Sequence, residues 1–181
     1  MLLALVGVTG VGKSYYKDII VDQLNFKKVN TIRTRKKRAN EDANKAGLFM
    51  TSEEIDELEK QDKIAYRFKV FGGVYAYLKD DIFSKDNMIM EMHYTTIDDW
   101  KKIRPDIKTI YILPTDIEIA KEKTKSRGLS PEKEFERLQE IEEHYNRFMF
   151  DESLRNKFDY IVYNNYDCKS QEEILNLVRS L

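Results

Sequence analysis

Residues 7–14 form a glycine-rich octapeptide, Gly-Val-Thr-Gly-Val-Gly-Lys-Ser, with the spacing G-x-x-x-x-G-K-[ST]. Glycines let successive backbone N–H groups surround a polyphosphate, the lysine can reach its β- and γ-phosphates, and the serine hydroxyl can bind Mg²⁺. An apolar strand signal at 2–6 and a helix signal at 15–24 flank the octapeptide, as this chemistry requires. We therefore expect a triphosphate and Mg²⁺ site built from Gly7, Thr9, Gly10, Val11, Gly12, Lys13 and Ser14.

A basic segment follows the predicted helix. Between Lys27 and Arg38 the chain has seven lysines and arginines and no acidic residue. Three interpretations compete: a solvated surface, a nucleic-acid or nuclear-localisation patch, and a clamp for a second phosphate. The balanced charge of the whole chain and the lack of interleaved aromatic residues weaken the second interpretation. In the third, Arg35 and Arg38 would bind one anion with paired guanidinium groups.

The elements that must position these groups alternate between strand and helix, which predicts an α/β fold with a largely parallel sheet. Strands are predicted at 2–6, 64–70, 87–92, 109–113 and 160–163. Helix starts are predicted by capping boxes at Thr51, Thr115 and Ser170, and by Ser130 before a proline. The apolar spacing of residues 132–150 predicts one long amphipathic helix. Residues 34–85 interrupt the alternation and predict a small, partly antiparallel insert.

The composition limits the classes of protein to which the chain can belong. Its 181 residues include 31 lysines and arginines and 32 acidic residues, for a net charge of −1. This balance gives no overall attraction to nucleic acid or to a membrane surface, and no segment has the ~20 apolar residues of a membrane span. The single cysteine, Cys168, excludes an internal disulfide. We expect a single-domain cytoplasmic protein whose partners are neither nucleic acid nor membrane.

Further segments, in chain order, resemble motifs of the guanylate kinase family. The family's T-T-R-x-x-R-x-G-E element, which binds the acceptor phosphate, is similar to residues 33–41, with the first threonine and the glycine replaced. Arg137 matches an arginine on the helix after the family's R-G-R-G lid motif. The motifs F-x-S-x-E-E-F, V-F-G-N-Y-Y-G, I-L-P, R-G-R-G and D-Y-V-I-V-N are similar to residues 49–55, 70–76, 112–114, 125–128 and 159–164.

The resemblance implies a P-loop NTPase-type three-layer α/β fold with a mostly parallel sheet. It implies one domain, residues 1–181, with a core at about 1–33, 86–121 and 138–181, an α+β insert for a nucleoside monophosphate at 34–85, and a helical lid at 122–137. The implied activity is ATP-dependent phosphoryl transfer to a nucleoside monophosphate, GMP or dGMP by default, which gives the diphosphate and ADP. Mg²⁺ is the implied cofactor.

The resemblance also implies a role for particular residues. Lys13, Arg127 and Arg137 would be catalytic, Ser14 would bind the metal, and Arg127 and Asn164 would join the octapeptide in binding ATP. Such a site suits phosphoryl transfer, which needs in-line positioning, exclusion of water and neutralised charge. The acceptor nucleotide would contact Thr34, Arg35, Arg38, Tyr66, Tyr75, Glu91 and His93, with Arg35, Arg38 and Tyr75 on its phosphate.

Three acceptor-site positions depart from the family's pattern. A tyrosine that contacts the acceptor phosphate falls at Gly47, a glutamate that reads guanine falls at Tyr66, and an aspartate that helps to read guanine falls at His93. Guanine presents N1–H and 2-amino donors, so these losses predict weak discrimination for GMP. Glu91 could substitute for the missing acceptors, order a Mg²⁺-bound water, or have a capping or salt-bridge role.

The two histidines have less specific interpretations. His93 is either a packed polar residue at a strand end or a group that reads the acceptor base, and His144 is expected at the surface or flank of the long helix.

Two other functions stay open. The chain could be a kinase for another nucleotide or a small phosphorylated metabolite, or a non-catalytic module of the same fold that binds a protein or peptide. Retention of Lys13, Ser14, Arg127 and Arg137 favours catalysis. A monomer or a homodimer is expected.

Overall fold

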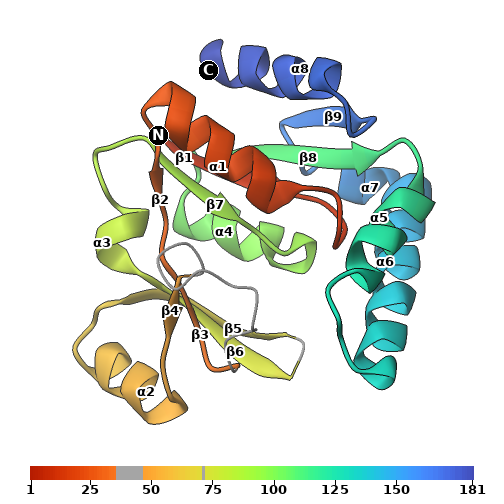
Figure 1. Ribbon diagram of the computed structural model, residues 1–181. Helices are drawn as coiled ribbons and strands as arrows, with labels where there is room; N and C mark the ends of the chain where they lie inside the picture. Colours follow the sequence, from red (N-terminus) through yellow and green to blue (C-terminus); the bar gives the residue numbers. More distant parts are fainter. Residues whose placement is uncertain (36–46, 71) are drawn as a thin grey trace.

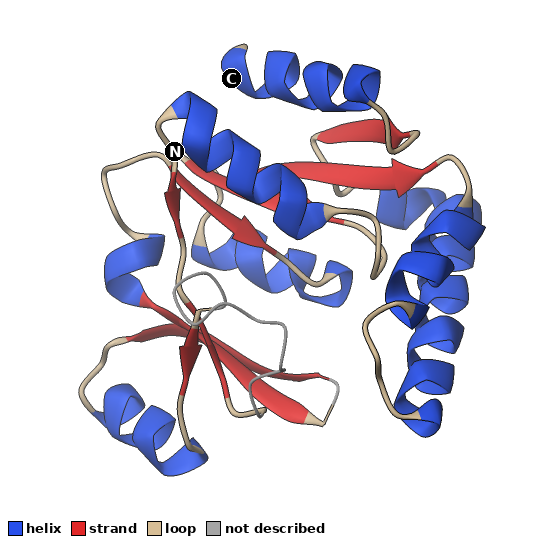
Figure 2. Cartoon of the chain, viewed as in Figure 1, coloured by secondary structure: helices blue, strands red, loops and turns tan. Residues whose placement is uncertain are grey.

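The computed structural model of the chain describes residues 1–35, 47–70 and 72–181. Two sheets dominate it, a central one between helices and a smaller one set apart from it (Figure 2). Among the described residues, none of the helices combines the length and the apolar character needed to cross a lipid bilayer.

The central sheet is parallel throughout its described pairings. β1 (Leu2–Val6) lies in the middle, between β7 (Met88–Glu91) and β8 (Lys108–Pro114), with β2 (Lys27–Lys28) and β9 (Tyr160–Asn164) at the two edges. Every side chain of β1 is buried, which explains why this strand reads as an unbroken apolar run rather than as an alternation.

Helices cover both faces of this sheet and give three layers (Figure 1). On one face, α1 (Lys13–Leu24) and α8 (Cys168–Arg179) pack Ile20 and Ile174 into the same cluster as Leu3. On the other face, α4 (Ile97–Ile103) and α7 (Glu152–Arg155) pack with the alternate residues of β1. The two faces of β1 thus contribute to two different apolar clusters, one on each side of the sheet.

The second sheet has the order β4 (Leu48–Phe49), β3 (Thr31–Arg33), β6 (Gly73–Leu78) and β5 (Ile64–Val70), with two antiparallel pairings and one parallel. α2 (Ser52–Lys60) covers its outer face, where Ile55 packs among the buried side chains of the sheet. The opposite face is turned towards the central sheet (Figure 1). A short helix, α3 (Lys79–Ile82), leads back to β7.

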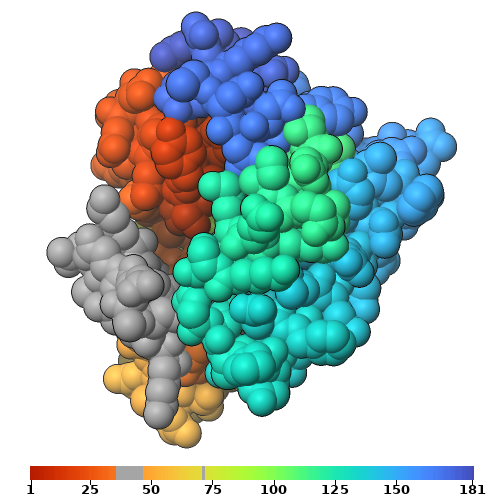
Figure 3. Space-filling view, turned by 45° about the vertical axis from the view of Figure 1, so that its right-hand side comes forward, coloured from red at the N-terminus to blue at the C-terminus, as the bar shows by residue number. Residues whose placement is uncertain are grey.

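A pair of helices forms the remaining flank. α5 (Ile117–Lys125) and α6 (Pro131–Phe150) pack side by side (Figure 1), and a short 3₁₀ helix, Tyr94–Thr96, precedes α4. In the space-filling view the green-to-cyan flank of α5 and α6 lies beside the red N-terminal segment, and the cavity described below is lined from both parts (Figure 3).

The predicted strands are all present, and β1 and β5 have the predicted bounds. β7 and β8 differ from prediction by one residue at each end, and β9 extends one residue further. The capping box at Thr51 is confirmed, with reciprocal hydrogen bonds to Glu54, and α6 begins after Ser130 as predicted.

Two predicted helix caps are wrong. Asp116 caps α5 and Asp167 caps α8, so the capping boxes predicted at Thr115 and Ser170 do not form. A neighbouring carboxylate accepts the exposed amide in each case, and the Thr115 hydroxyl instead donates to the carbonyl of Asn164.

The expectation that His144 lies at the surface is wrong. It is 2% exposed, its Nε2 lies 3.0 Å from the Tyr111 hydroxyl, and its ring stacks on Tyr94 with centroids 3.7 Å apart. The reason is the direction of α6, which turns His144 and Phe148 into the core and leaves Phe135 61% exposed. Burial is the main cause that lowers the pKa of His144 from 6.5 to about 2.

This burial predicts a loss of stability in mild acid. The unfolded chain binds a proton at His144 near its ordinary pKa of 6.5 and the folded chain does not, so the contribution is full above 6.5 and declines as pH falls towards the folded value. At pH 5 we expect a loss of about 2 kcal/mol relative to pH 8 from this residue. Urea denaturation of the wild type and of His144→Gln at both pH values isolates it. An equal pH dependence in the two proteins contradicts the prediction.

Candidate functional site

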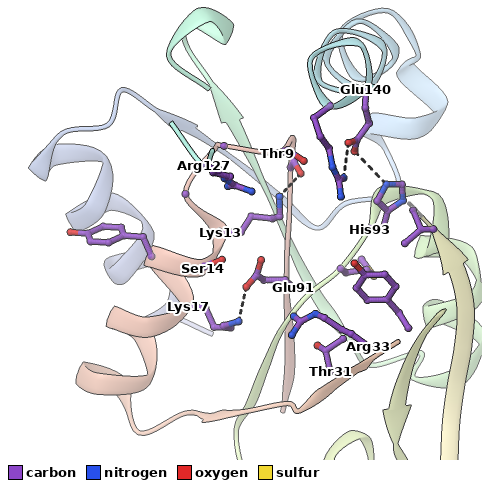
Figure 4. A pocket seen from close by; sticks show the side chains of 18 of the residues that line it. Thr9, Lys13, Ser14, Lys17, Thr31, Arg33, Glu91, His93, Arg127 and Glu140 are labelled. Carbon is purple, nitrogen blue, oxygen red and sulfur yellow. Dashed lines mark hydrogen bonds and ion pairs between the residues drawn. The ribbon is translucent and has the colours of Figure 1, made fainter. Parts of the chain in front are cut away.

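A cavity of about 530 Å³ lies where the glycine-rich octapeptide, the inner face of the second sheet and the α5–α6 pair meet. Figure 4 shows Lys13 and Ser14 on one side of it, Thr31 and Arg33 on another, and His93 and Glu140 towards α6. The octapeptide, the basic segment and the lid motif, which are distant in sequence, therefore contribute to one site.

The octapeptide forms a tight loop between β1 and α1. Gly10 has a φ of +85°, and a Cβ there would lie 2.2 Å from the carbonyl oxygen of Ala120. A Cβ at Gly7 would lie 2.5 Å from the carbonyl oxygen of Ile112. Both contacts are far shorter than a side chain permits, so the loop can approach α5 and β8 only with glycine at these positions. Gly7, Thr9, Gly10 and Gly12 line the cavity as predicted.

Lys13 is held over this loop. Its Nζ donates to the carbonyl oxygens of Gly7 at 2.8 Å and of Val8 at 2.9 Å. Burial is the largest cause that lowers its pKa to about 8, although the carboxylate of Glu91 acts in the opposite direction. An anion bound beside Lys13 would compensate for this burial and restore the preference for the charged form.

Glu91 forms an ion pair at the end of β7, where Lys17 Nζ lies 2.5 Å from its Oε1. Burial alone would raise the pKa of Glu91, but the charges of Lys17 and Lys13 and hydrogen bonds from Lys17 and Ser14 hold it at about 2. The salt-bridge interpretation of Glu91 is therefore confirmed. The same carboxylate is in contact with the Ser14 hydroxyl, so two oxygen groups that suit Mg²⁺ lie together.

No cluster of three metal-ligating His, Cys, Asp or Glu side chains occurs in the part of the chain that the structure describes. Mg²⁺ keeps several waters and binds through one or two protein oxygens together with substrate phosphates. Ser14 and Glu91 could supply such a pair.

The second sheet forms the wall opposite Lys13. Thr31, Arg33 and Arg35 alternate along β3 and its extension, and all three line the cavity. The remaining wall residues of this sheet are aromatic or apolar, namely Phe68, Val70, Tyr75 and Tyr77. The structure thus brings Arg35 and Tyr75, both predicted to bind the acceptor phosphate, to the same wall.

α6 and the end of β7 close the far side. Arg137 Nη1 lies 3.0 Å from Glu140 Oε2, and His93 Nε2 lies 3.8 Å from Glu140 Oε1. Burial would raise the pKa of Glu140, but hydrogen bonds from His93 and Arg137 and their charges keep it below its ordinary value. Arg127, in the loop after α5, also lines the cavity. Lys13 and the two arginines therefore face one space from three elements.

Two predicted acceptor residues do not line this cavity. The Tyr66 hydroxyl donates to Asp99 Oδ2 at 2.6 Å, and its ring packs on Phe68 and Trp100 instead of facing the site. Thr34 lies on the other face of the strand, where its hydroxyl accepts from the backbone N–H of Val74 at 2.9 Å. The alternation of the strand explains this, since Thr34 stands between two residues that face inwards. Arg38 lies outside the described residues.

Asn164 holds the octapeptide in place through the backbone of Val11. Val11 is fully buried, and its carbonyl oxygen accepts from Asn164 Nδ2 at 2.9 Å. The other end of the amide, Asn164 Oδ1, accepts from the Tyr16 hydroxyl at 2.7 Å and from the backbone N–H of Tyr166 at 2.8 Å. The amide is committed at both ends, so it positions the octapeptide against β9 and α1.

A second cavity, of about 350 Å³, adjoins the first across Gly12, Tyr15 and Lys123. Tyr15 is joined to α8 by a hydrogen bond of 2.6 Å from its hydroxyl to Gln171 Oε1. Asn164, Tyr166 and Cys168 also line this cavity. Its position beside the octapeptide would suit the remainder of a nucleotide if the phosphates bound in the first cavity.

Sequence reasoning assigned no site role to several residues on the cavity walls. Lys17 lies four residues after Lys13, and Glu140 lies three residues after Arg137, both on the same helical face as a predicted site residue. Arg33 precedes Arg35 by two residues, which is the period of a strand face. These spacings from predicted site residues are the signals in the sequence that could have identified Lys17, Glu140 and Arg33 as cavity residues.

The sequence model of the family described as guanylate kinase matches residues 1–179. Among curated relatives, the guanylate kinase of Mycoplasma mobile is 27% identical in an alignment that covers 98% of this chain and 92% of that protein. The guanylate kinase of Wolbachia pipientis wMel is also 27% identical, with 98% and 89% covered. The similarity therefore extends over almost the whole length of both proteins.

Solved structures give the same picture of the fold. A guanylate kinase from Anaplasma phagocytophilum superposes with a TM-score of 0.74 at 17% identity, covering 99% of this chain and 85% of that one. A shikimate kinase from Bacteroides thetaiotaomicron gives a TM-score of 0.54 at 12% identity, covering 99% and 96%. The predicted P-loop three-layer fold with a mostly parallel sheet is confirmed.

The contacts of Asn164 predict that its amide is structural. In Asn164→Leu, three polar partners lose their hydrogen bonds, two of them buried, and we expect a loss of about 3 kcal/mol in the free energy of unfolding. Asn165→Leu, at the exposed neighbouring position, is the matched control and should change stability by less than about 0.5 kcal/mol. Urea denaturation measures both; similar stabilities for the two variants would refute the assignment.

Proposed function

Because the family model of guanylate kinases spans residues 1–179, the chain belongs to the guanylate kinase family, and we propose that it transfers the γ-phosphoryl group of ATP to a nucleoside monophosphate. GMP or dGMP is the default acceptor, and the products are the nucleoside diphosphate and ADP. One observation carries the proposal: Lys13 on its glycine loop faces Arg35 and Tyr75 across one cavity that Arg127 and Arg137 also line.

The cavity walls support a division of labour between the two substrates. The octapeptide and Lys13 would hold the β- and γ-phosphates of ATP, while Arg35 and Tyr75 would hold the acceptor phosphate on the opposite wall, with Arg38 as a further ligand. This arrangement would bring the attacking oxygen of the acceptor towards the γ-phosphoryl group. Arg127 and Arg137 would neutralise the charge that spreads over the phosphoryl oxygens during transfer.

Ser14 and Glu91 are the residues we propose to hold Mg²⁺, Ser14 directly and Glu91 through a water molecule. Mg²⁺ supplies charge neutralisation on the β- and γ-phosphates when it is bound with ATP. The contact between the Ser14 hydroxyl and the ionised Glu91 carboxylate keeps both groups oriented towards this position.

The remaining part of ATP would lie in the second cavity. The adenine ring would lie among Tyr15, Tyr166 and Gln171, near Asn164, and its phosphates would pass Gly12 into the first cavity. Free ATP and nucleoside monophosphates are cytoplasmic metabolites. The proposal thus implies a cytoplasmic enzyme, a monomer or homodimer, that needs neither nucleic acid nor membrane.

Two parts of the chain would move during the reaction cycle. We propose residues 34–85 as the insert that binds the monophosphate and residues 122–137 as the lid, on a core of about 1–33, 86–121 and 138–181. Closure would bring Arg127 and Arg137 onto the phosphoryl group and exclude water, which otherwise accepts it.

The activity is tested by ADP release with MgATP across the common ribo- and deoxyribonucleoside monophosphates. We expect turnover with at least one of them. Lys13→Ala should lower kcat by at least about 100-fold with every acceptor, because it removes charge stabilisation from the transferred group. Arg35→Ala should mainly raise the KM of the acceptor, because its interaction is already made in the ground state.

MgATP binding without turnover of any monophosphate would contradict the proposal and favour a non-catalytic module. Turnover of only a different phosphorylated metabolite would support the second alternative, a kinase with another acceptor.

Discrimination for guanine should be weak. Tyr66 and His93 occupy the positions of the family's guanine-reading carboxylates, and neither side chain is a carboxylate. Both side chains also have partners within the protein, since the Tyr66 hydroxyl is engaged by Asp99 and His93 Nδ1 lies 2.7 Å from Thr95 Oγ1. We expect kcat/KM for GMP to exceed that for IMP, which lacks the 2-amino group, by less than about tenfold. A ratio above about 1,000 would mean that the described wall does not account for base reading.

A further inference from the structure

Arg33 is a charged residue of the cavity wall to which the reaction as described gives no role. It stands where the family pattern has a threonine, at the end of β3, and its strand neighbour is Tyr75 on β6. Its guanidinium carbon lies 6.0 Å from the centroid of the Tyr75 ring. Figure 4 shows the side chain pointing into the cavity beside Thr31 and below Glu91.

The guanidinium of Arg33 has an unused donor. Its Nη1 is buried, and the described residues give this nitrogen no hydrogen-bond partner. A buried cationic donor without an acceptor is costly, so a partner from outside the described chain would stabilise it.

The acidic residues of the described cavity wall are already paired. Asp18 Oδ1 lies 2.7 Å from Lys28 Nζ, which leaves this carboxylate engaged. Glu91 is paired with Lys17, and Glu140 with Arg137. The anion that best completes Arg33 therefore comes from a substrate, and phosphate matches the fork of a guanidinium.

Gly47 shows which phosphate this is. The family's tyrosine that contacts the acceptor phosphate falls at Gly47, so the chain has lost that ligand. A Cβ at Gly47 would lie 2.9 Å from Arg33 Nη1 and 2.4 Å from the carbonyl oxygen of Thr31. The guanidinium of Arg33 thus lies against the point from which the tyrosine side chain would leave the backbone, and the two departures from the pattern are in contact.

We propose that Arg33 binds the 5′-phosphate of the acceptor nucleotide, in place of the tyrosine lost at Gly47 and together with Arg35 and Tyr75. Residues two apart on a strand are about 7 Å apart, so the long side chains of Arg33 and Arg35 can converge on one phosphate. This proposal rests on the proposed function, because it requires a nucleoside monophosphate as acceptor.

The test compares Arg33→Thr and Arg33→Lys with the wild type. In Arg33→Thr we expect a 10- to 100-fold higher KM for the acceptor, by the same factor for every accepted monophosphate, with the KM for ATP changed less than about threefold. Arg33→Lys should fall between the two, because an ammonium keeps the charge but not the fork. The matched control is Arg67→Thr. Arg67 lies on the same sheet as Arg33 but is paired with Asp56 and Glu59 of α2, so its substitution should leave both KM values unchanged.

Calorimetric titration of the wild type and Arg33→Thr with a monophosphate and with its parent nucleoside gives a second readout. We expect the substitution to weaken the monophosphate and leave the nucleoside unaffected, an effect that a merely structural role would not produce. Equal weakening of both ligands, or a loss in KM that depends on the base, would assign Arg33 to the base and overturn the proposal. An unchanged acceptor KM and affinity would also overturn it.

The proposed function and the proposed role of Arg33 can fail separately. If the wild type turns over no monophosphate, the proposed function fails whatever the variants do. If the wild type is active and Arg33→Thr is indistinguishable from it, only the assignment of Arg33 fails.

Discussion

The conformation of residues 7–12 is the constraint on which the rest of the site depends. Gly10 packs against the backbone of α5, and the carbonyl oxygen of Val11 is fixed by Asn164 from β9. Lys13 then closes the loop through the carbonyl oxygens of Gly7 and Val8. Elements from the beginning, middle and end of the chain therefore hold one short loop, and the direction of α1 and the position of Lys13 follow from it.

Charge is distributed unevenly around that loop. The whole chain carries a net charge of −1, yet the described cavity wall holds more basic than acidic side chains. Its three acids are neutralised locally, by Lys28, Lys17 and Arg137. Other basic groups remain directed at the cavity. A site of this kind attracts polyanions over a short range without making the protein a general polyanion binder.

The parts of the fold that were predictable from sequence are those decided by local pattern. The apolar run of β1, the octapeptide and the helix after Ser130 depend on neighbouring residues, and each is present. The caps of α5 and α8 were not predictable to the residue, because an aspartate lies close to each predicted cap. Asp116, next to Thr115, accepts from the N–H of Glu118, and Asp167, three residues before Ser170, accepts from the N–H of Ser170 itself.

The site was predictable in its residue types more than in its side-chain directions. Tyr66 turns to Asp99, a partner more than thirty positions away that only the packing of α4 brings near. His144 shares a helical face with Ile141 and Phe148, so its burial was open to prediction, but its partner Tyr111 on β8 was not. Glu140 and Lys17 share a helical face with Arg137 and Lys13, but their place on the cavity wall follows only from the packing of their helices around a common space.

The uneven burial of α6 along its length affects how its two halves can move. Its C-terminal half is embedded through Ile141, His144 and Phe148, whereas its N-terminal half carries Arg137 and the exposed Phe135. A continuous helix is stiff along its axis, so a small tilt at the embedded half becomes a larger swing at the free end. Arg137 and Glu140 would therefore move together, and the helix would pivot about the core residues around His144.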